Sequence, residues 1–149
     1  MTQDENKNDL GISYPIGEDD LIAALNELLE AERAGARVTL ETAHQIMGHD
    51  LAPLVIDIQH DEVRWCKMLL GILRSLRAAP STATGSFYEK AIAIEDLRER
   101  LLFINRGQGW VVRRLEKLIP RIHEPHIHSQ LQEMLNAHIL NIDRVEKSL

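Results

Sequence analysis

The sequence contains very little cysteine and few aromatic residues, and each scarcity excludes a class of structure. Cys66 is the only cysteine, so the chain cannot form an intrachain disulfide, and we expect a reducing compartment such as the cytoplasm. Aromatic residues make up 4% of the chain, whereas Leu, Ile and Ala supply most of the apolar side chains. This composition favours helices over sheets, in which aromatic residues are enriched.

The chain also lacks a long hydrophobic run and an excess of basic residues. No apolar stretch approaches the roughly 18 residues that a membrane span needs. Residues 1–9 are polar and acidic, and they lack the apolar segment that is typical of a signal peptide. The net charge of -6 disfavours binding to nucleic acid or to an anionic membrane. We therefore expect no nucleic-acid partner and no membrane partner.

Apolar residues recur at intervals of three and four along most of the chain, which predicts amphipathic helices. Four helices are expected, over residues 19–47, 51–77, 87–119 and 125–147. A chain of 149 residues suits a single domain. We therefore predict an all-α four-helix bundle over residues 18–149. Residues 1–17 show no sustained period and are expected to form a flexible N-terminal tail.

The two halves of the predicted bundle are similar to each other at an offset of 73 residues. The segment ERAGARV at 32–38 aligns with NRGQGWV at 105–111, which indicates two related helix hairpins. Glu32 and Trp65 are 33 residues apart, and so are Asn105 and His138. Each hairpin therefore places one mid-helix position opposite a pair of residues spaced i, i+3. Bundles with two metal ions use this arrangement, with a Glu on two helices and a Glu-x-x-His pair on the other two.

Several segments resemble the ferritin-like superfamily, and its rubrerythrin-like members in particular. The segments are LLEAERAGARV, HDEVRWCKML, TGSFYEKAIAI and NRGQGWVVRRL, and the resemblance covers roughly residues 18–147. They are most similar to a bacterial family of small ferritin-like proteins that carries no known activity. The resemblance implies a ferritin-like bundle built from two antiparallel helix hairpins, with a carboxylate–histidine metal centre between them.

The di-iron pattern of that superfamily is only partly present here. Glu32, Glu62 and His138 occupy ligand positions, whereas Trp65, Asn105 and Leu135 stand where the pattern has a histidine and two glutamates. The resemblance therefore implies a reduced centre that holds one ion at the three remaining ligands. Iron and manganese both suit mixed carboxylate and imidazole ligands. The alternative is a metal-free centre, in which the two acids are held by hydrogen-bond donors.

Four further side chains are expected around this centre. Trp65 would fill the volume of a vacated metal position, and its indole N–H would need a partner. Asn105 and Gln108 can donate hydrogen bonds to the buried acids. Asp61 either supplements Glu62 or faces the solvent.

Two glycines interrupt the third predicted helix. Gly107 and Gly109 each cost about 1 kcal/mol relative to Ala, so a packing or functional reason is expected. Close packing against Gly35 and Ala36 of the first helix is favoured over a local bulge that would aim Asn105 or Gln108 into the centre.

The connection between the second and third helices decides the topology. Ferritin-like bundles use a crossover that runs the length of the bundle, but residues 78–86 reach only about 30 Å when extended. The second helix is longer, at roughly 40 Å. A crossover therefore needs a longer connector, such as residues 77–90, with Ser86 and Glu89 forming a capped turn inside it. In the alternative, an up-down-up-down bundle, Ser86 caps the third helix itself.

Nothing in the sequence identifies a substrate, because it contains no dinucleotide-binding or phosphate-binding loop. Three functions stay open: a metal-dependent oxidoreductase or oxygen- or peroxide-handling protein, a metal-free dimeric interaction protein, and a small-ligand binding module. Apolar residues outside the inward stripe of the third helix predict a homodimer. They are Leu102, Trp110, Val112 and Ile119.

Overall fold

The structure is a computed structural model that describes residues 14–149, and this part of the chain contains helices but no strand. Four long helices are present: α2 (Glu18–Gln45), α3 (Ala52–Ser75), α5 (Leu97–Leu118) and α6 (Pro125–Ser148). A short helix, α4 (Phe87–Ile92), precedes α5, and a single 3-10 turn, η1 (Ile119–Arg121), follows it. The predicted all-α four-helix bundle is confirmed.

Most of the predicted N-terminal tail lies outside the described residues. The last part of the tail contacts the bundle, since the backbone N–H of Ile16 donates a hydrogen bond of 3.0 Å to the carbonyl of Arg121. The Arg121 side chain also reaches the carbonyl of Tyr14, at 3.4 Å. Residues 14–17 are thereby attached to the end of the bundle where α5 turns into α6.

The third long helix begins ten residues later than the sequence predicts, at residue 97 rather than residue 87. Asp96 is its N-cap, and the Asp96 carboxylate accepts a hydrogen bond of 2.9 Å from the backbone N–H of Glu99. Ser86 makes no side-chain capping hydrogen bond. The prediction was wrong here because the apolar period continues through α4 and hides the break before Asp96.

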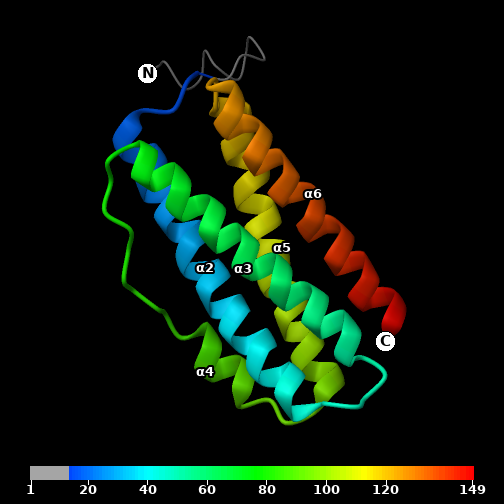
Figure 1. The fold of residues 1–149 in the computed structure, drawn as a ribbon. Coiled ribbons are helices and arrows are strands. Elements are labelled where there is room, and N and C mark those ends of the chain that lie inside the picture. The colour runs from blue at the N-terminus through cyan, green and yellow to red at the C-terminus, as the bar shows by residue number, and fades with distance from the viewer. Residues whose placement is uncertain (1–13) are drawn as a thin grey trace, which may run out of the picture.

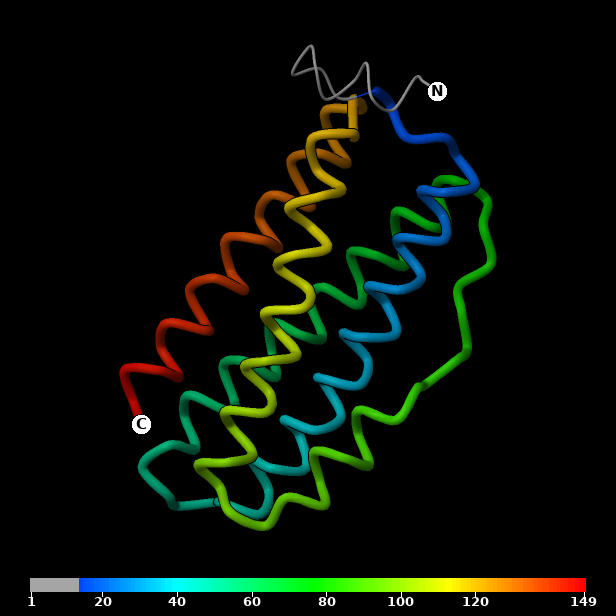
Figure 2. Tube along the Cα trace, turned by 180° about the vertical axis from the view of Figure 1, so that it is seen from behind, coloured from blue at the N-terminus to red at the C-terminus, as the bar shows by residue number. Residues whose placement is uncertain are grey.

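The two hairpins are joined by a crossover, as the ferritin-like alternative predicts. From the end of α3 the chain returns along α2, passes through α4 and then enters α5 at the opposite end of the bundle (Figures 1 and 2). Ser81 hydrogen-bonds Asn26 at 2.7 Å and Glu30 at 2.5 Å, and Tyr88 hydrogen-bonds Glu41 further along α2. The connector therefore runs parallel to α2, and α3 and α5 point in the same direction.

The core consists of two apolar clusters that are separated by polar side chains. One cluster includes Leu25, Trp65 and Leu131, and the other includes Val38, Ile58 and Leu101. The buried polar residues include Glu32, Glu62, Asn105, Gln108 and His138, which are at most 8% exposed. Burying polar groups is costly unless they are paired. This central polar layer is therefore the candidate functional site.

Gly107 packs against the crossover, not against α2. A Cβ atom placed on Gly107 would lie 2.8 Å from two ring carbons of Phe87 in α4. The predicted packing of this glycine against Gly35 and Ala36 is therefore wrong. The α-helix continues without a bulge from Leu97 to Leu118, so the glycine serves to dock the short helix α4.

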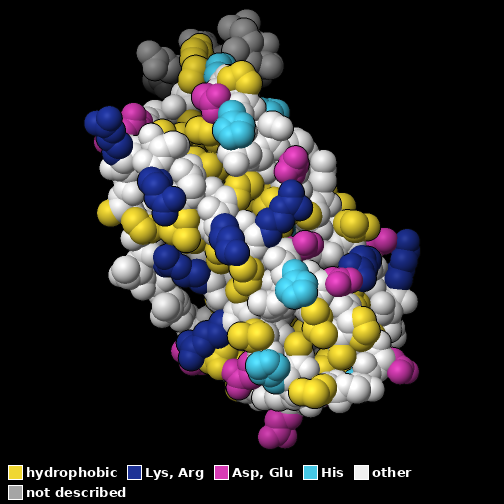
Figure 3. Space-filling view, viewed as in Figure 1, with side chains coloured by type: hydrophobic (Ala, Val, Ile, Leu, Met, Phe, Trp, Pro, Cys, Tyr) yellow, Lys and Arg dark blue, Asp and Glu magenta, His cyan; other side chains and the backbone are white. Residues whose placement is uncertain are grey.

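The outer surface is mixed in character, and no helix within residues 14–149 is long and apolar enough to cross a membrane. Figure 3 shows charged side chains spread over the face formed by α3 and α6, with hydrophobic side chains exposed over the lower part of that face. Of the residues on which the predicted dimer was based, Ile119 is buried and Leu102, Trp110 and Val112 are half-buried. The most exposed large hydrophobic side chains are Met47 and Leu140, at 80% and 58%.

Candidate metal centre

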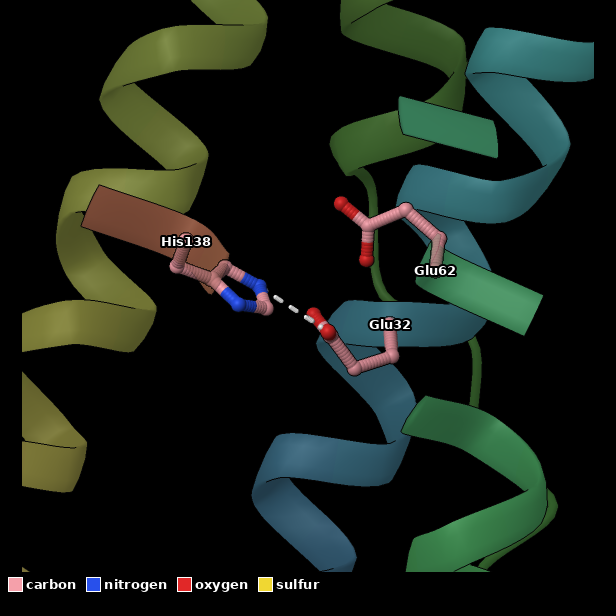
Figure 4. A group of neighbouring side chains, drawn as sticks. All are labelled: Glu32, Glu62 and His138. Carbon is pink, nitrogen blue, oxygen red and sulfur yellow. Dashed lines mark ion pairs between the residues drawn. The ribbon is translucent and has the colours of Figure 1, made fainter. Parts of the chain in front are cut away.

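Three predicted ligands meet in the middle of the bundle, each from a different helix. Glu32 comes from α2, Glu62 from α3 and His138 from α6, and their side chains point toward one another (Figure 4). Each residue is at most 3% exposed. One ligand atom from each residue lies within 4.8 Å of the other two. Within residues 14–149 this is the one group of three or more such side chains that could hold a metal ion.

The imidazole of His138 is oriented by its own helix. Its Nδ1 lies 2.9 Å from the carbonyl oxygen of Met134, one turn earlier in α6. Because a carbonyl only accepts hydrogen bonds, Nδ1 carries the hydrogen, and in the neutral ring Nε2 presents its lone pair. Nε2 lies 2.9 Å from Oε1 of Glu32. The backbone thus fixes the tautomer that a metal ligand needs.

The two carboxyl groups are held in an environment that disfavours their charged forms. Burial raises the pKa of Glu32 from 4.5 to about 8, although the hydrogen bond with Glu62 lowers it. Burial also raises the pKa of Glu62 well above its ordinary value, and the neighbouring charge of Glu32 raises it further. At neutral pH the metal-free pair therefore retains at least one proton.

Gly35 makes room for the carboxyl group of Glu62. A Cβ atom on Gly35 would lie 3.0 Å from Cδ of Glu62 and 3.1 and 3.2 Å from its two oxygens. Gly35 stands one turn after Glu32 in the middle of α2, where glycine costs about 1 kcal/mol relative to alanine. The absence of a side chain at this position allows the two acids to approach each other.

The remaining predicted residues take different roles around the centre. Asn105 donates a hydrogen bond of 3.1 Å to the carbonyl of Ile142 in α6, and Asp61 accepts one of 2.9 Å from Asn141. Asp61 is half-buried. Trp65 is 1% exposed and packs in the apolar cluster that contains Leu25 and Leu131. Asp61 and Asn105 therefore help to tie α6 to α3 and α5.

Several buried polar atoms around the centre have no hydrogen-bond partner among residues 14–149. They are Oε1 of Glu32, Oε2 of Glu62, Nε2 of His138, Nε1 of Trp65, Oδ1 of Asn105 and both amide atoms of Gln108. Although Glu32 Oε1 and His138 Nε2 are close, their contact does not have the directions of a hydrogen bond. Three ligand-type atoms thus face one another without being paired. Two carboxylate oxygens and one imidazole nitrogen in this arrangement suit the binding of a cation.

Cys66 lies beside the centre but is not activated. It is half-buried, and burial together with the charges of Glu32 and Glu62 raises the pKa of its thiol to about 12. A thiol with such a high pKa stays protonated and is a poor nucleophile and a poor metal ligand. Cys66 therefore packs against the core.

Comparison with known proteins assigns the family. The sequence profile of the domain of unknown function DUF6306 matches residues 19–147. The chain belongs to the DUF6306 family. A search of curated proteins found no match.

The DUF6306 chain has a ferritin-like fold. It is similar to a crystal structure described as a ferritin-like, diiron-carboxylate protein from Bacillus anthracis str. Ames, with a TM-score of 0.76 and 20% sequence identity. The similarity covers 90% of this chain and 99% of the other. At this level of identity the comparison establishes the fold alone, and the predicted ferritin-like fold is confirmed.

Sequence reasoning missed two features of the DUF6306 centre. The first is the role of Gly35, although a mid-helix glycine three residues after Glu32 is itself a signal. The second is a cavity of about 420 Å³ that reaches Glu32, Glu62 and Gln108 from the side of α4 and α5. The cavity depends on how the crossover packs, and a single sequence does not reveal that packing.

Proposed function

We propose that this chain binds one iron or manganese ion at Glu32, Glu62 and His138 and handles dioxygen or peroxide there. The observation that carries the proposal is the convergence of three buried ligand atoms within 4.8 Å of one another. Two carboxylates and one imidazole form a donor set that suits both metals. A single cysteine and a fold without a disulfide also suit a reducing compartment such as the cytoplasm.

The unpaired atoms support the proposal energetically. A buried polar atom without a partner costs roughly 1–3 kcal/mol, and Glu32, Glu62 and His138 each contribute one such atom. A cation between them would satisfy all three and would favour the ionised forms of both carboxyl groups. Metal binding would therefore release the protons that the metal-free pair retains.

The number of ions is proposed from the residues that have replaced ligands. The similar crystal structure is described as a diiron-carboxylate protein. In this chain Trp65, Asn105 and Leu135 stand at ligand positions of the di-iron pattern, and none of their side chains is a carboxylate or an imidazole. The three retained ligands are enough for one ion that completes its shell with small molecules.

The residues around the centre have separate tasks in this proposal. The carbonyl of Met134 holds the ring of His138, with Nε2 directed at Glu32. Glu32 and Glu62 would hold the ion, and both carboxyl groups would release their protons when it binds. The apolar clusters on either side lower the local dielectric constant, which strengthens electrostatic interactions within the centre. When bound, iron or manganese would supply the one-electron chemistry by which dioxygen or peroxide reacts.

Metal analysis of protein purified without a tag tests the proposal. We expect about one equivalent of iron or manganese per chain, and we expect Glu62→Gln and His138→Ala to lose most of it. His60→Ala is the matched control, because His60 is an exposed residue on the same helix as Glu62. Wild-type protein without metal after growth in iron and manganese would contradict the proposal. Unchanged metal content in both variants would contradict it equally.

The proposed reaction is tested separately from metal binding. Metal-loaded protein should consume hydrogen peroxide, or dioxygen in the presence of a reductant, faster than the same protein after chelation. The Glu62→Gln variant should lose this difference. A metal-loaded protein that consumes neither would leave the metal site in place and remove the redox function.

A further inference from the structure

A cavity of about 420 Å³ is lined by residues of α2, α3, α4 and α5. Its inner end is lined by the buried residues Glu32, Glu62 and Gln108, and its outer end by the exposed residues Arg106 and Arg113. It therefore leads from the surface to the candidate metal centre. Its volume lies within the roughly 300–1,000 Å³ that small-molecule sites occupy.

The walls of the cavity are apolar and rich in aromatic rings, in a chain that has few of them. Phe87 and Phe103 stack with their ring centroids 5.0 Å apart and their planes at 17°. Trp110 also lines the cavity, as do the buried side chains of Ile104 and Val111. Rigid aromatic walls of this kind favour a flat, apolar ligand body.

The inner end carries an unsatisfied amide. Gln108 is 4% exposed, and neither atom of its side-chain amide has a hydrogen-bond partner among residues 14–149. An amide both donates and accepts hydrogen bonds. A neutral hydroxyl group, which also does both, is the simplest complement. Leaving a buried amide unpaired is costly, so a ligand that reaches Gln108 needs a polar atom at its inner end.

The outer end carries two positive charges without acidic partners in the described part of the chain. Arg106 and Arg113 are seven residues apart on α5, which places them on the same side of the helix. Arg106 extends over the ring of Phe103, at 5.4 Å from its centroid. The remaining arginine, Arg113, lies near Gly109. In a protein with a net charge of -6, this positive rim is suited to a carboxylate.

We propose that the cavity binds a small phenolic carboxylic acid, with its ring between the aromatic walls, its hydroxyl group at Gln108 and its carboxylate at Arg106 and Arg113. The inference names the substrate class of the proposed metal centre and therefore rests on that proposed function. The hydroxyl end lies beside Glu32 and Glu62, where an oxidising centre would act on it.

Calorimetric binding of three matched compounds tests the inference. The compounds are para-hydroxyhydrocinnamate, hydrocinnamate, which lacks the hydroxyl group, and para-propylphenol, which lacks the acid. We expect para-hydroxyhydrocinnamate to bind to the full chain at one site and each of the others to bind roughly tenfold more weakly. Equal affinity for all three, or no binding of the first, would overturn the inference.

Variants assign each preference to its residues. Gln108→Leu should remove the preference for the hydroxyl group and keep the preference for the acid. The double variant Arg106→Gln, Arg113→Gln should remove the preference for the acid and keep the preference for the hydroxyl group. Arg74→Gln, an exposed change on α3, should leave both preferences unchanged. Ala31→Phe, on the cavity wall, should abolish binding of all three compounds. The two arginines lie on the surface, so the double variant should still fold. If it keeps the preference for the acid, the placement of the carboxylate at Arg106 and Arg113 is wrong.

The metal content of every sample separates the two proposals. Protein that contains metal but does not bind para-hydroxyhydrocinnamate overturns the ligand and leaves the metal centre. Protein that binds the compound with the expected preferences, but contains no metal under any loading condition, overturns the metal centre and supports the cavity as a binding site.

Discussion

Glu32 and Glu62 are the residues on which the proposed chemistry depends, because both are buried and burial raises the pKa of each. Their raised pKa values mean that the folded metal-free protein retains protons that the unfolded chain releases. The stabilisation from such a group is complete below its unfolded pKa, near 4.5, and is lost as the pH rises through the folded pKa, which for Glu32 is about 8. The metal-free protein should therefore lose stability between these two values.

Glu62→Gln tests this electrostatic account, because it keeps the shape and removes one charge. In metal-free protein it should raise the free energy of unfolding by about 1–3 kcal/mol at pH 8, with a smaller gain toward pH 4. In metal-loaded protein the sign should reverse, because the ion holds the carboxylate ionised. Urea denaturation at several pH values measures both. An equal effect at pH 4 and pH 8 would show that Glu62 is an ordinary solvated residue.

Gly35 and Gly71 form a matched pair of helical glycines. A Cβ atom on Gly35 would meet the carboxyl group of Glu62 at 3.0–3.2 Å, whereas one on Gly71 would meet nothing within 4 Å. Gly71→Ala should stabilise the protein by about 0.5–1 kcal/mol. Gly35→Ala should lack that gain and lower the metal content, because it displaces Glu62. If Gly35→Ala gains stability and retains metal as Gly71→Ala does, the glycine has no part in shaping the centre.

At the scale of elements, α4 matters most, because it docks the crossover and forms one wall of the cavity. Phe87 of α4 lies directly over Gly107 of α5. Gly107→Ala should destabilise the protein by about 1–3 kcal/mol, since the ring must move. Phe87→Leu should relieve the clash, so that the double variant loses less than the sum of the single ones. Additive losses in chemical denaturation would mean that the ring and the glycine are not in contact.

The sequence predicts the long helices and the convergence of Glu32, Glu62 and His138 well, for a physical reason. Glu32, Glu62 and His138 lie on apolar stripes, and a helical period projects such positions onto one another without knowledge of the loops. The start of α5 was missed, since Phe87, Ala91 and Ile94 continue the apolar period up to Asp96, the residue that caps the helix. The choice between crossover and up-down topology depended on whether residues 87–96 belong to the connector or to the third long helix. Its outcome rests on contacts such as that between Ser81 and Asn26, which join distant parts of the chain.

At the scale of the whole molecule, the exposed hydrophobic side chains of α6 favour association of two chains. Ile139 and Leu140 are 48% and 58% exposed, and Ile56 of α3 is 41% exposed. We expect a homodimer at high micromolar concentration that Leu140→Glu weakens at least about tenfold. Met47→Glu serves as the control, because Met47 is 80% exposed in the loop between α2 and α3. A monomeric mass for the wild-type protein in light scattering would contradict this expectation.

The most direct test of the metal centre is the anomalous diffraction of crystals grown with ferrous or manganous ions, recorded at the absorption edge of each metal. The account predicts one strong peak per chain, bounded by the carboxylates of Glu32 and Glu62 and by Nε2 of His138. In crystals of His138→Ala that peak should be weak or missing. A peak at the exposed residues His123 and His126 instead, or no peak in the bundle at all, would contradict the account.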